Sequence, residues 1–483
     1  MFQLLKRIVK QSLAYALGTI LNRAVSVVML PFYTRHLSKP DVGILEILLI
    51  TTTILLYILQ LGMGSALFRS ALYKKNVDRK EITSTAYLFV GGFALVSIVT
   101  LIFLARPLAA LLFDDPDQAR LLRIIFAGDF FLLLNVVPMA ILRIDQRSNR
   151  FAQIAGASFF ISIGLNILYL VVLGRGVEGV VTANALSAAL FSIIFFVSVR
   201  TEIGLAFSWK ELRDMLGFGL PLVPGVAGDM VLMMSDRYFL RFYWGLDEVA
   251  VYGVALRIGI VISLVVSAFQ MAWPAIFFPM VREKEAPVRI SRLFSYFLIM
   301  LTTFGLGLSI FARDLFTVLV TERFIEGAAV IPLIALAFLF YGIYYFSAIG
   351  IQVEKKTGYY ALMMGVAAVV AIGFNFILVP GWGIMGAAVA KMMAFACLGL
   401  GIAAISQRYY AIPYEWGRIV RIGLSACVLY ALARLIPSGL APAPLLARLM
   451  VFSLFPVALW VSGFYNKSER SFIRNRLRNV VRS

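Results

Sequence analysis

The chain has 483 residues, of which 61% are hydrophobic and 14% are charged. A soluble protein of this length could not bury so much apolar side chain, so the composition predicts a polytopic membrane protein. The net charge of +19 does not indicate a nucleic-acid partner, because the basic residues lie in short segments between long apolar runs.

Hydropathy predicts fourteen transmembrane helices, since about 20 apolar residues of helix cross a bilayer. Six precede residue 200, at 13–34, 42–67, 84–105, 121–142, 151–173 and 177–199. Six more follow, at 216–239, 249–273, 293–312, 328–351, 359–379 and 384–405. Two close the chain, at 419–435 and 445–464. We therefore expect an all-α membrane bundle.

A long-period repeat divides this bundle. An Asn followed by Gly-x-x-Gly and Ala occurs in 166–183 and again in 375–390, about 207 residues later. Because spans one and seven begin on the same side, the halves are predicted to be parallel six-helix pseudo-repeats. The predicted parts are an N-lobe (1–200), a C-lobe (201–410), two further helices (411–465) and a basic amphipathic cytoplasmic tail (466–483).

The Lys and Arg residues predict the orientation. Alternate loops, counted from the N-terminus, carry 29 of the 44 basic residues, and the opposite loops carry 12. Cytoplasmic loops are enriched in Lys and Arg, so both termini are predicted to be cytoplasmic.

Metal and disulfide chemistry finds little support. Both cysteines, Cys397 and Cys427, lie inside apolar runs and are interpreted as small packing residues. The single histidine, His36, excludes a cluster of histidine ligands. No nucleophile–base pair or phosphate-binding loop occurs either, so we expect no catalytic residues, no metal and no cofactor.

Three segments resemble the multidrug/oligosaccharidyl-lipid/polysaccharide (MOP) exporter superfamily. They are PFYTRHLSKPDVG at 31–43, LGMGSALFR at 61–69 and the repeated Asn and Gly-x-x-Gly signature. The most similar branch is the polysaccharide transporters, which include Wzx-like O-antigen flippases. The resemblance implies a V-shaped, MATE-like bundle in the bacterial inner membrane that works by alternating access and is not an enzyme.

The same resemblance implies a substrate and partners. The substrate would be an undecaprenyl-pyrophosphate-linked oligosaccharide, the repeat unit of an O-antigen, capsule or exopolysaccharide, moved from the cytoplasmic to the outer leaflet. The implied partners are the lipid bilayer, a polysaccharide polymerase and the chain-length machinery.

Two arginines near mid-membrane, together with Asn22, are the predicted substrate-binding residues. Arg23, beside Asn22, lies in the first span and Arg257 in the eighth, where an unpaired charge is costly. Arginine suits a pyrophosphate because its planar fork donates paired hydrogen bonds. In the similar lipid II flippases, cavity arginines lie on helices one, two and eight; here the helix-two segment carries Glu46 instead. The alternative is that Arg23 is half of a structural ion pair.

Four further polar residues are predicted to serve coupling or charge pairing. Asp129 is either a counter-ion for one of the arginines or a proton-handling group. In related proteins sodium binds between helices seven, eleven and twelve, where Asp229 and Asn375 match and Lys391 departs from the pattern. We predict that Lys391 is a tethered cation paired with Asp229, which would remove sodium dependence. The alternative is that Lys391 binds an acidic sugar.

Two other functions remain open from the sequence. A cation-coupled multidrug exporter of the same superfamily would favour an acidic or apolar cavity. A membrane glycan polymerase or ligase would need a sizeable outer loop, and the outer loops predicted around 106–120 and 313–327 are short.

Overall fold

The computed structural model describes residues 25–73, 78–281, 283–466 and 469–471, and all regular secondary structure within them is helical. Eleven helices of this part are long and apolar enough to cross a membrane, or twelve if the bent pair Leu246–Gly259 and Val261–Gln270 is one span. Helices are required because hydrocarbon offers no water to free backbone groups. The all-α polytopic fold is confirmed, whereas the number fourteen stays a prediction because much of the first span lies outside the described residues.

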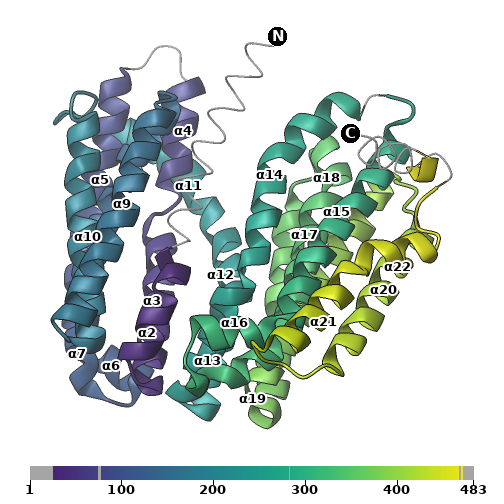
Figure 1. Cartoon of the computed structure of the whole chain (residues 1–483). Coiled ribbons are helices and arrows are strands. Elements are labelled where there is room, and N and C mark those ends of the chain that lie inside the picture. Colours follow the sequence, from purple (N-terminus) through teal and green to yellow (C-terminus); the bar gives the residue numbers. More distant parts are fainter. Residues whose placement is uncertain (1–24, 74–77, 282, 467–468, 472–483) are drawn as a thin grey trace, which may run out of the picture. The chain divides into compact units, whose positions relative to one another are not determined.

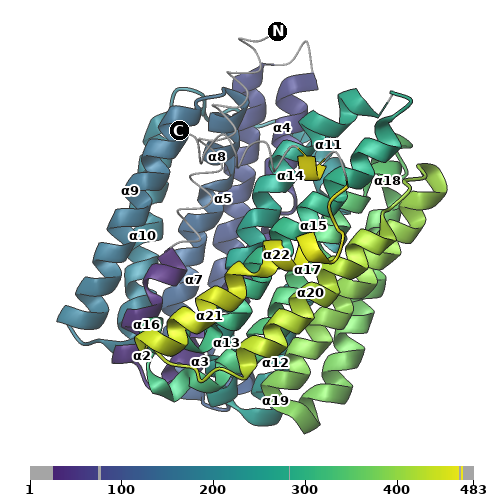
Figure 2. The same ribbon diagram turned by 45° about the vertical axis from the view of Figure 1, so that its right-hand side comes forward.

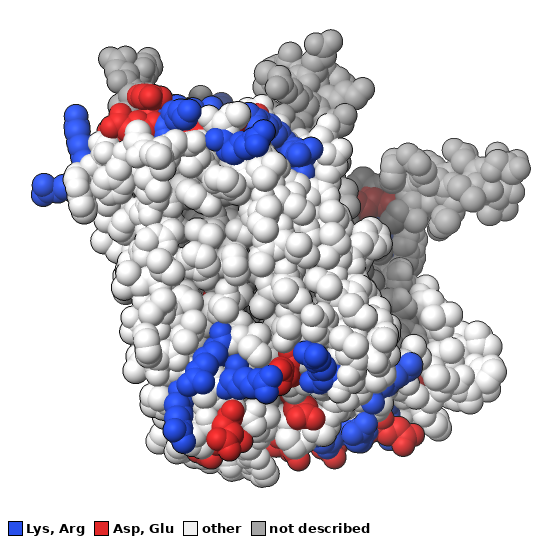
Figure 3. Space-filling model, turned by 90° about the vertical axis from the view of Figure 1, so that its left-hand side faces the viewer, with Lys and Arg blue, Asp and Glu red and all other residues white. Residues whose placement is uncertain are grey.

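The surface agrees with a membrane location. Figure 3 shows two bands of charged side chains separated by a broad band of other residues. Large apolar side chains point outward from the helices, among them Phe103 (79% exposed) and Phe160 (72% exposed). Exposed apolar surface on this scale is stable only against lipid. The chain is therefore a multi-pass membrane protein.

The chain forms two compact units. The first is Met1–Arg257 with Met364–Ala390, and the second is Ile258–Met363 with Lys391–Ser483. The predicted division into an N-lobe, a C-lobe and two added helices stays a prediction, as does the internal repeat. The predicted amphipathic tail lies largely outside the described residues.

The first unit contains two groups of helices. One comprises α2 (Leu30–His36), α3 (Lys39–Leu59), α4 (Met63–Tyr73), α5 (Arg79–Phe103), α6 (Ala105–Phe113), η1 (Pro116–Gln118), α7 (Ala119–Leu134), α8 (Val136–Ile144), α9 (Ser148–Ile167), η2 (Leu168–Val172) and α10 (Gly176–Val199). The other comprises α11 (Trp209–Gly219), η3 (Leu220–Leu222), α12 (Val223–Trp244) and α13 (Leu246–Gly259). Figure 1 shows α5, α7, α9 and α10 running side by side, and α7 packs against both α5 and α10.

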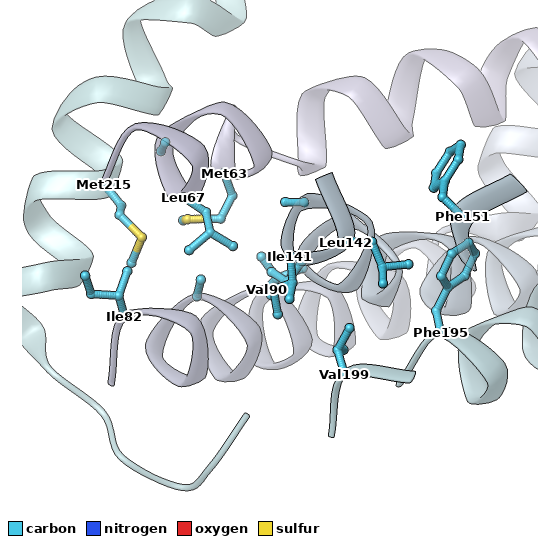
Figure 4. Close-up of a cluster of buried hydrophobic side chains, with 14 of the residues drawn as sticks. Met63, Leu67, Ile82, Val90, Ile141, Leu142, Phe151, Phe195, Val199 and Met215 are labelled. Carbon is cyan, nitrogen blue, oxygen red and sulfur yellow. The ribbon is translucent and has the colours of Figure 1, made fainter. Parts of the chain in front are cut away.

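A hydrophobic core fixes one end of the first unit (Figure 4). It draws apolar side chains from six helices: Met63 and Leu67 of α4, Ile82 and Val90 of α5, Ile141 and Leu142 of α8, Phe151 of α9, Phe195 and Val199 of α10, and Met215 of α11. Within a bilayer such packing is stabilised mainly by van der Waals contacts, because lipid tails are as apolar as these side chains. This packing fixes the positions of α4, α8 and α11, and therefore also of the side chains on their opposite faces.

A sharp turn separates α3 from α4. Leu61 (φ +49°) and Gly62 (φ +66°) both adopt left-handed backbone conformations there. Gly62 also touches the backbone of Gly219, since a Cβ built on Gly62 would lie 2.8 Å from the Gly219 Cα. Only glycine allows α4 and the end of α11 to approach so closely.

The second unit is built around α15 (Ala286–Ile310), which packs against α17 (Ile331–Ser347) and α20 (Trp416–Arg434). Figure 2 shows α21 (Pro442–Ser453) and α22 (Phe455–Val461) following α20. Its remaining elements are α14 (Val261–Met280), α16 (Ala312–Leu319), η4 (Glu322–Val330) and α18 (Ile349–Val353). The aromatic segment 338–346 of α17 packs inside this unit, where the Phe346 ring lies 4.3 Å from the Trp273 ring.

One long helix, α19 (Gly358–Tyr409), covers two predicted spans, 359–379 and 384–405. The helix is interrupted at Gly383, whose backbone (φ +51°, ψ −130°) is non-helical. This break falls between the two predicted spans. It can occur at Gly383 because Gly tolerates the positive φ that other residues avoid.

Candidate functional site

The first unit contains a large cavity of about 1140 Å³. Its wall is mostly apolar and comes from three places: the junction of α3 and α4, the junction of α7 and α8, and the η3 turn with its neighbours. The lining residues include Tyr57, Phe68, Leu132, Val136, Met139, Phe218, Leu222 and Val226. The η3 turn contains Pro221, which has no N–H for a helical hydrogen bond, and this turn helps to shape the cavity.

Two arginines place positive charge on this apolar wall. Arg69 of α4 and Arg143 of α8 both line the cavity and are exposed. The guanidinium of Arg69 lies 4.9 Å from the centre of the Phe218 ring, and that of Arg143 lies 5.7 Å from the Phe151 ring. Cation–π contacts of this kind orient a guanidinium while leaving its N–H groups free to donate.

A second cavity, of about 780 Å³, continues the first across Arg69 and Phe218. It is lined by one face of α11, including Trp209, Lys210 and Arg213. Asp214 also lines it and lies 3.7 Å from Arg69, too far for a tight pair. The two cavities together, which we call the basic cavity, therefore carry an excess of positive charge beside an apolar wall.

Ion pairs tie together the loops at this end of the unit. Asp145 pairs with Arg79 and with Arg147 (3.1 Å), and Arg147 also reaches Glu202 (2.5 Å). Burial raises the pKa of Glu202, but hydrogen bonds from Thr201 and Arg147 outweigh it and lower the pKa below its ordinary value. The loops that follow α8 and α10 are thus joined by ion pairs through Arg147.

The sequence held a signal for this cavity that our site prediction missed. The segment 61–69, noted above for its resemblance, supplies Gly62, Gly64, Ser65, Phe68 and Arg69 to the lining. Arg69 and Arg143 had been counted only as loop charges that set the orientation. Their common cavity depends on how α4, α8 and α11 pack, and hydropathy carries no information on that.

Arg257 lies elsewhere in the first unit, in a buried ion pair. Its guanidinium is 2.6 Å from Glu46 of α3, and both side chains are at most 10% exposed. Arg237 of α12 lies 3.9 Å from the other oxygen of Glu46, and the ring of Tyr33 lies 5.4 Å from the Arg257 guanidinium. The Glu46 that replaces an expected helix-two arginine is therefore the counter-ion of Arg257. The predicted role of Arg257 in substrate binding stays a prediction.

Hydrogen bonds extend this pair into the helix bundle. The hydroxyl of Tyr33 donates to the Asn166 side chain (3.2 Å), and Asn166 donates to Asn184 on α10 (3.1 Å). Buried amides and hydroxyls need such partners in an apolar interior. The repeated Asn of the sequence signature is thus a structural link between α2, α9 and α10.

The other predicted residues lie on several helices. Asn22 and Arg23 fall outside the described residues. Asp129 of α7 is buried and lines a largely apolar cavity of about 370 Å³ in the first unit. Asp229 of α12 is half-buried.

Two predicted residues lie on α19. Asn375 is buried and donates to the Ala371 carbonyl (2.8 Å). Lys391 is buried, and its ammonium lies 5.7 Å from the centre of the Phe395 ring. The proposed pairing of Lys391 with Asp229 stays a prediction.

The basic cavity suits an amphiphile with an anionic head. Guanidinium groups bind phosphate oxygens in paired hydrogen bonds, while the apolar wall accepts hydrocarbon. Among the described residues, no three His, Cys, Asp or Glu side chains gather in a way that could hold a metal ion.

Residues 32–347 match the family described as "Polysaccharide biosynthesis protein". An uncharacterized membrane protein of Methanocaldococcus jannaschii is 21% identical over 416 residues, which cover 79% of this chain and 80% of that protein. The sequence comparison thus extends over most of the chain.

Two solved structures share the fold. The lipid II flippase MurJ, in an inward closed conformation, aligns with a TM-score of 0.73 at 15% identity, covering 94% of this chain and 99% of MurJ. A multidrug resistance MATE family transporter of the MOP superfamily, facing outward, aligns with a TM-score of 0.61 at 17% identity, covering 85% and 97%. The predicted resemblance to the MOP superfamily is confirmed, and the family and fold are those of transporters.

Proposed function

Because this chain belongs to the polysaccharide biosynthesis protein family, we propose that it is a flippase for a lipid-linked oligosaccharide. The substrate is an undecaprenyl-pyrophosphate-linked repeat unit of an O-antigen, capsule or exopolysaccharide. It moves from the cytoplasmic to the outer leaflet of a bacterial inner membrane by alternating access. A polysaccharide polymerase and the chain-length machinery use the translocated product.

The observation that carries this proposal is the basic cavity. Arg69 and Arg143 project from a largely apolar wall and offer two guanidinium forks to one pyrophosphate. The apolar wall receives the prenyl chain next to the head group. A cationic drug would meet like charges here, which disfavours the multidrug alternative. The short outer loops predicted around 106–120 and 313–327 likewise disfavour a polymerase or ligase.

Mass spectrometry of lipid-linked intermediates tests the function. In a strain that lacks this chain, complete repeat units on undecaprenyl pyrophosphate should accumulate, because synthesis continues while export stops. Plasmid-borne wild-type protein should return them to the parental level. Unchanged intermediates, together with altered efflux of cationic drugs, would instead support the exporter.

The orientation can be tested with two single cysteines in a background that lacks Cys397 and Cys427. Lys80→Cys lies at the predicted cytoplasmic end of α5, and Asp117→Cys lies in the predicted outer loop; both positions are exposed. An impermeant thiol reagent added to whole cells, with the outer membrane permeabilised where there is one, should label Asp117→Cys and spare Lys80→Cys until the cells are lysed. The opposite labelling would invert the orientation.

A further inference from the structure

The second unit has a cavity of its own, about 580 Å³ in volume, at the end of the unit where α15 and α20 finish. Its wall comes from α16, η4, the last turns of α20 and the connection from α20 to α21. We call it the Arg313 pocket. Polar residues of its wall include Arg313, Glu326, Tyr430, Arg434, Ser438 and Arg448. It shares no lining residue with the basic cavity and is therefore a separate site.

A buried ion pair fixes the shape of this pocket. Arg448 of α21 is buried and donates to both carboxylate oxygens of Asp314 on α16. Arg448 also donates to the Gly439 carbonyl (2.7 Å), and the Gly439 N–H donates to Asp314 (3.1 Å). These bonds hold the connection between α20 and α21 against α16. Because Arg448 and Asp314 neutralise each other, their charges are not available to a ligand.

Three exposed side chains carry the remaining charge of the pocket. Arg313 and Arg434 are positive and Glu326 is negative, which gives a net charge of about +1. Within the described part of the chain, none of these three side chains forms an ion pair with another residue. Their guanidinium groups can therefore donate hydrogen bonds to an anion that enters the pocket.

An apolar strip on α20 leads to this pocket. Leu424, Val428 and Leu432 are exposed and lie four residues apart, so they share one face of the helix. Leu435, which is also exposed, follows this strip and lines the pocket itself. Exposed apolar side chains of a membrane helix lie against lipid tails. A lipid tail that lies along this strip therefore ends beside the pocket.

The pocket lies at the level of lipid head groups. The helix α20 has 19 residues. At 1.5 Å per residue it is roughly 28 Å long, close to the thickness of the hydrocarbon layer. The pocket is at the C-terminal end of α20, where the chain turns back into α21 (Figure 2). This is the end predicted to face the outer leaflet, and Tyr430 in the wall is of a residue type enriched at this level.

We propose that the Arg313 pocket binds the phosphodiester head group of a glycerophospholipid. Arg313 and Arg434 donate to the phosphate, and an acyl chain lies along the apolar strip of α20. A phosphodiester carries one negative charge, which balances the net charge of the pocket, whereas a pyrophosphate carries more. Since Arg313 is on α16 and Arg434 on α20, one bound phosphate joins α20 and its successors to the rest of the unit. This site does not depend on the proposed function.

Thermal unfolding of the purified full-length protein in neutral detergent tests the site. The melting temperature of wild type should rise with added phosphatidylglycerol and saturate, because a ligand that binds only the folded state stabilises it. Diacylglycerol with the same acyl chains lacks the phosphate and should give no saturable rise. Arg313→Ala/Arg434→Ala should raise the half-saturating concentration of phosphatidylglycerol about tenfold or more, because hydrogen bonds to a charged group are lost.

Two single variants complete the test. Arg323→Ala removes an exposed arginine of η4 that does not line the pocket, so it should bind phosphatidylglycerol like wild type. Glu326→Gln removes the like charge from the wall and should lower the half-saturating concentration about two- to fivefold. If the double arginine variant fails to fold, Glu326→Gln still decides, because an unchanged half-saturating concentration would contradict a phosphate at this wall.

Other results would overturn the site. They are a wild-type melting temperature that ignores phosphatidylglycerol, an equal response to diacylglycerol, and a wild-type response in the folded double variant. Sodium phosphate at constant ionic strength separates a lipid from a free anion. Saturation by phosphate alone would make this a site for a free anion and would also overturn the proposal. Because none of these measurements involves transport, failure here leaves the proposed function untouched.

Discussion

Replacing Arg143 with alanine should slow export of the lipid-linked oligosaccharide about 10- to 100-fold and leave the amount of folded protein in the membrane unchanged. The side chain is exposed in the basic cavity, so its loss leaves no buried group unpaired. A hydrogen bond to a charged group contributes about 1.5–3 kcal/mol, and each 1.4 kcal/mol is a factor of ten. Export is measured as the rate at which labelled repeat units reach the outer leaflet in the complemented deletion strain.

Matched variants distinguish the paired hydrogen bonds of the Arg143 guanidinium from the effect of its positive charge alone. Arg143→Lys should recover only part of the rate, because lysine retains the charge but cannot form paired hydrogen bonds with a phosphate. Arg150→Ala removes an exposed arginine that lines neither part of the basic cavity and should export at the wild-type rate. Wild-type export by Arg69→Ala/Arg143→Ala would show that the head group binds elsewhere.

Replacing Glu46 with alanine should lower the free energy of unfolding by about 3–5 kcal/mol. The change leaves the Arg257 guanidinium buried without the carboxylate that lies 2.6 Å away. The measurement is the fall in melting temperature of the purified protein. Asp114→Asn is the control, because Asp114 is 82% exposed in its pair with Arg241, and exposed pairs contribute about 0–1 kcal/mol.

The double variant Glu46→Leu/Arg257→Met decides what Arg257 does. Apolar side chains of similar size in place of a buried pair restore most of the lost stability. If Arg257 serves only this pair, the stable double variant should also export at close to the wild-type rate. A stable double variant without export would establish the phosphate-binding role predicted from the sequence.

Hydropathy was sufficient to predict most of the helices, because a bilayer allows few alternatives to a long apolar helix. The predicted span 84–105, for example, corresponds to α5 (Arg79–Phe103). The boundary between the predicted spans 359–379 and 384–405 likewise coincides with the non-helical backbone at Gly383. These features depend on neighbours in the sequence.

The candidate sites could not be predicted to the same degree, because they depend on contacts between distant segments. Glu46 and Arg257 were both recognised as unusual, but their pairing follows from the packing of α3 against α13. Arg143 was interpreted only as one of the loop charges that predict the membrane orientation, and its position in the basic cavity was not predicted.

The contact between Gly62 and Gly219 makes tolerance to substitution very uneven along a short stretch of chain. Any side chain at either position would push α4 and α11 apart beside the basic cavity. Gly64 and Gly217, two residues away on each helix, would accept a Cβ at ordinary contact distance or in open space. If these four glycines were randomised and functional variants selected, Gly64 and Gly217 should vary while Gly62 and Gly219 should be retained. The retained pair would mark the point where the two helices touch.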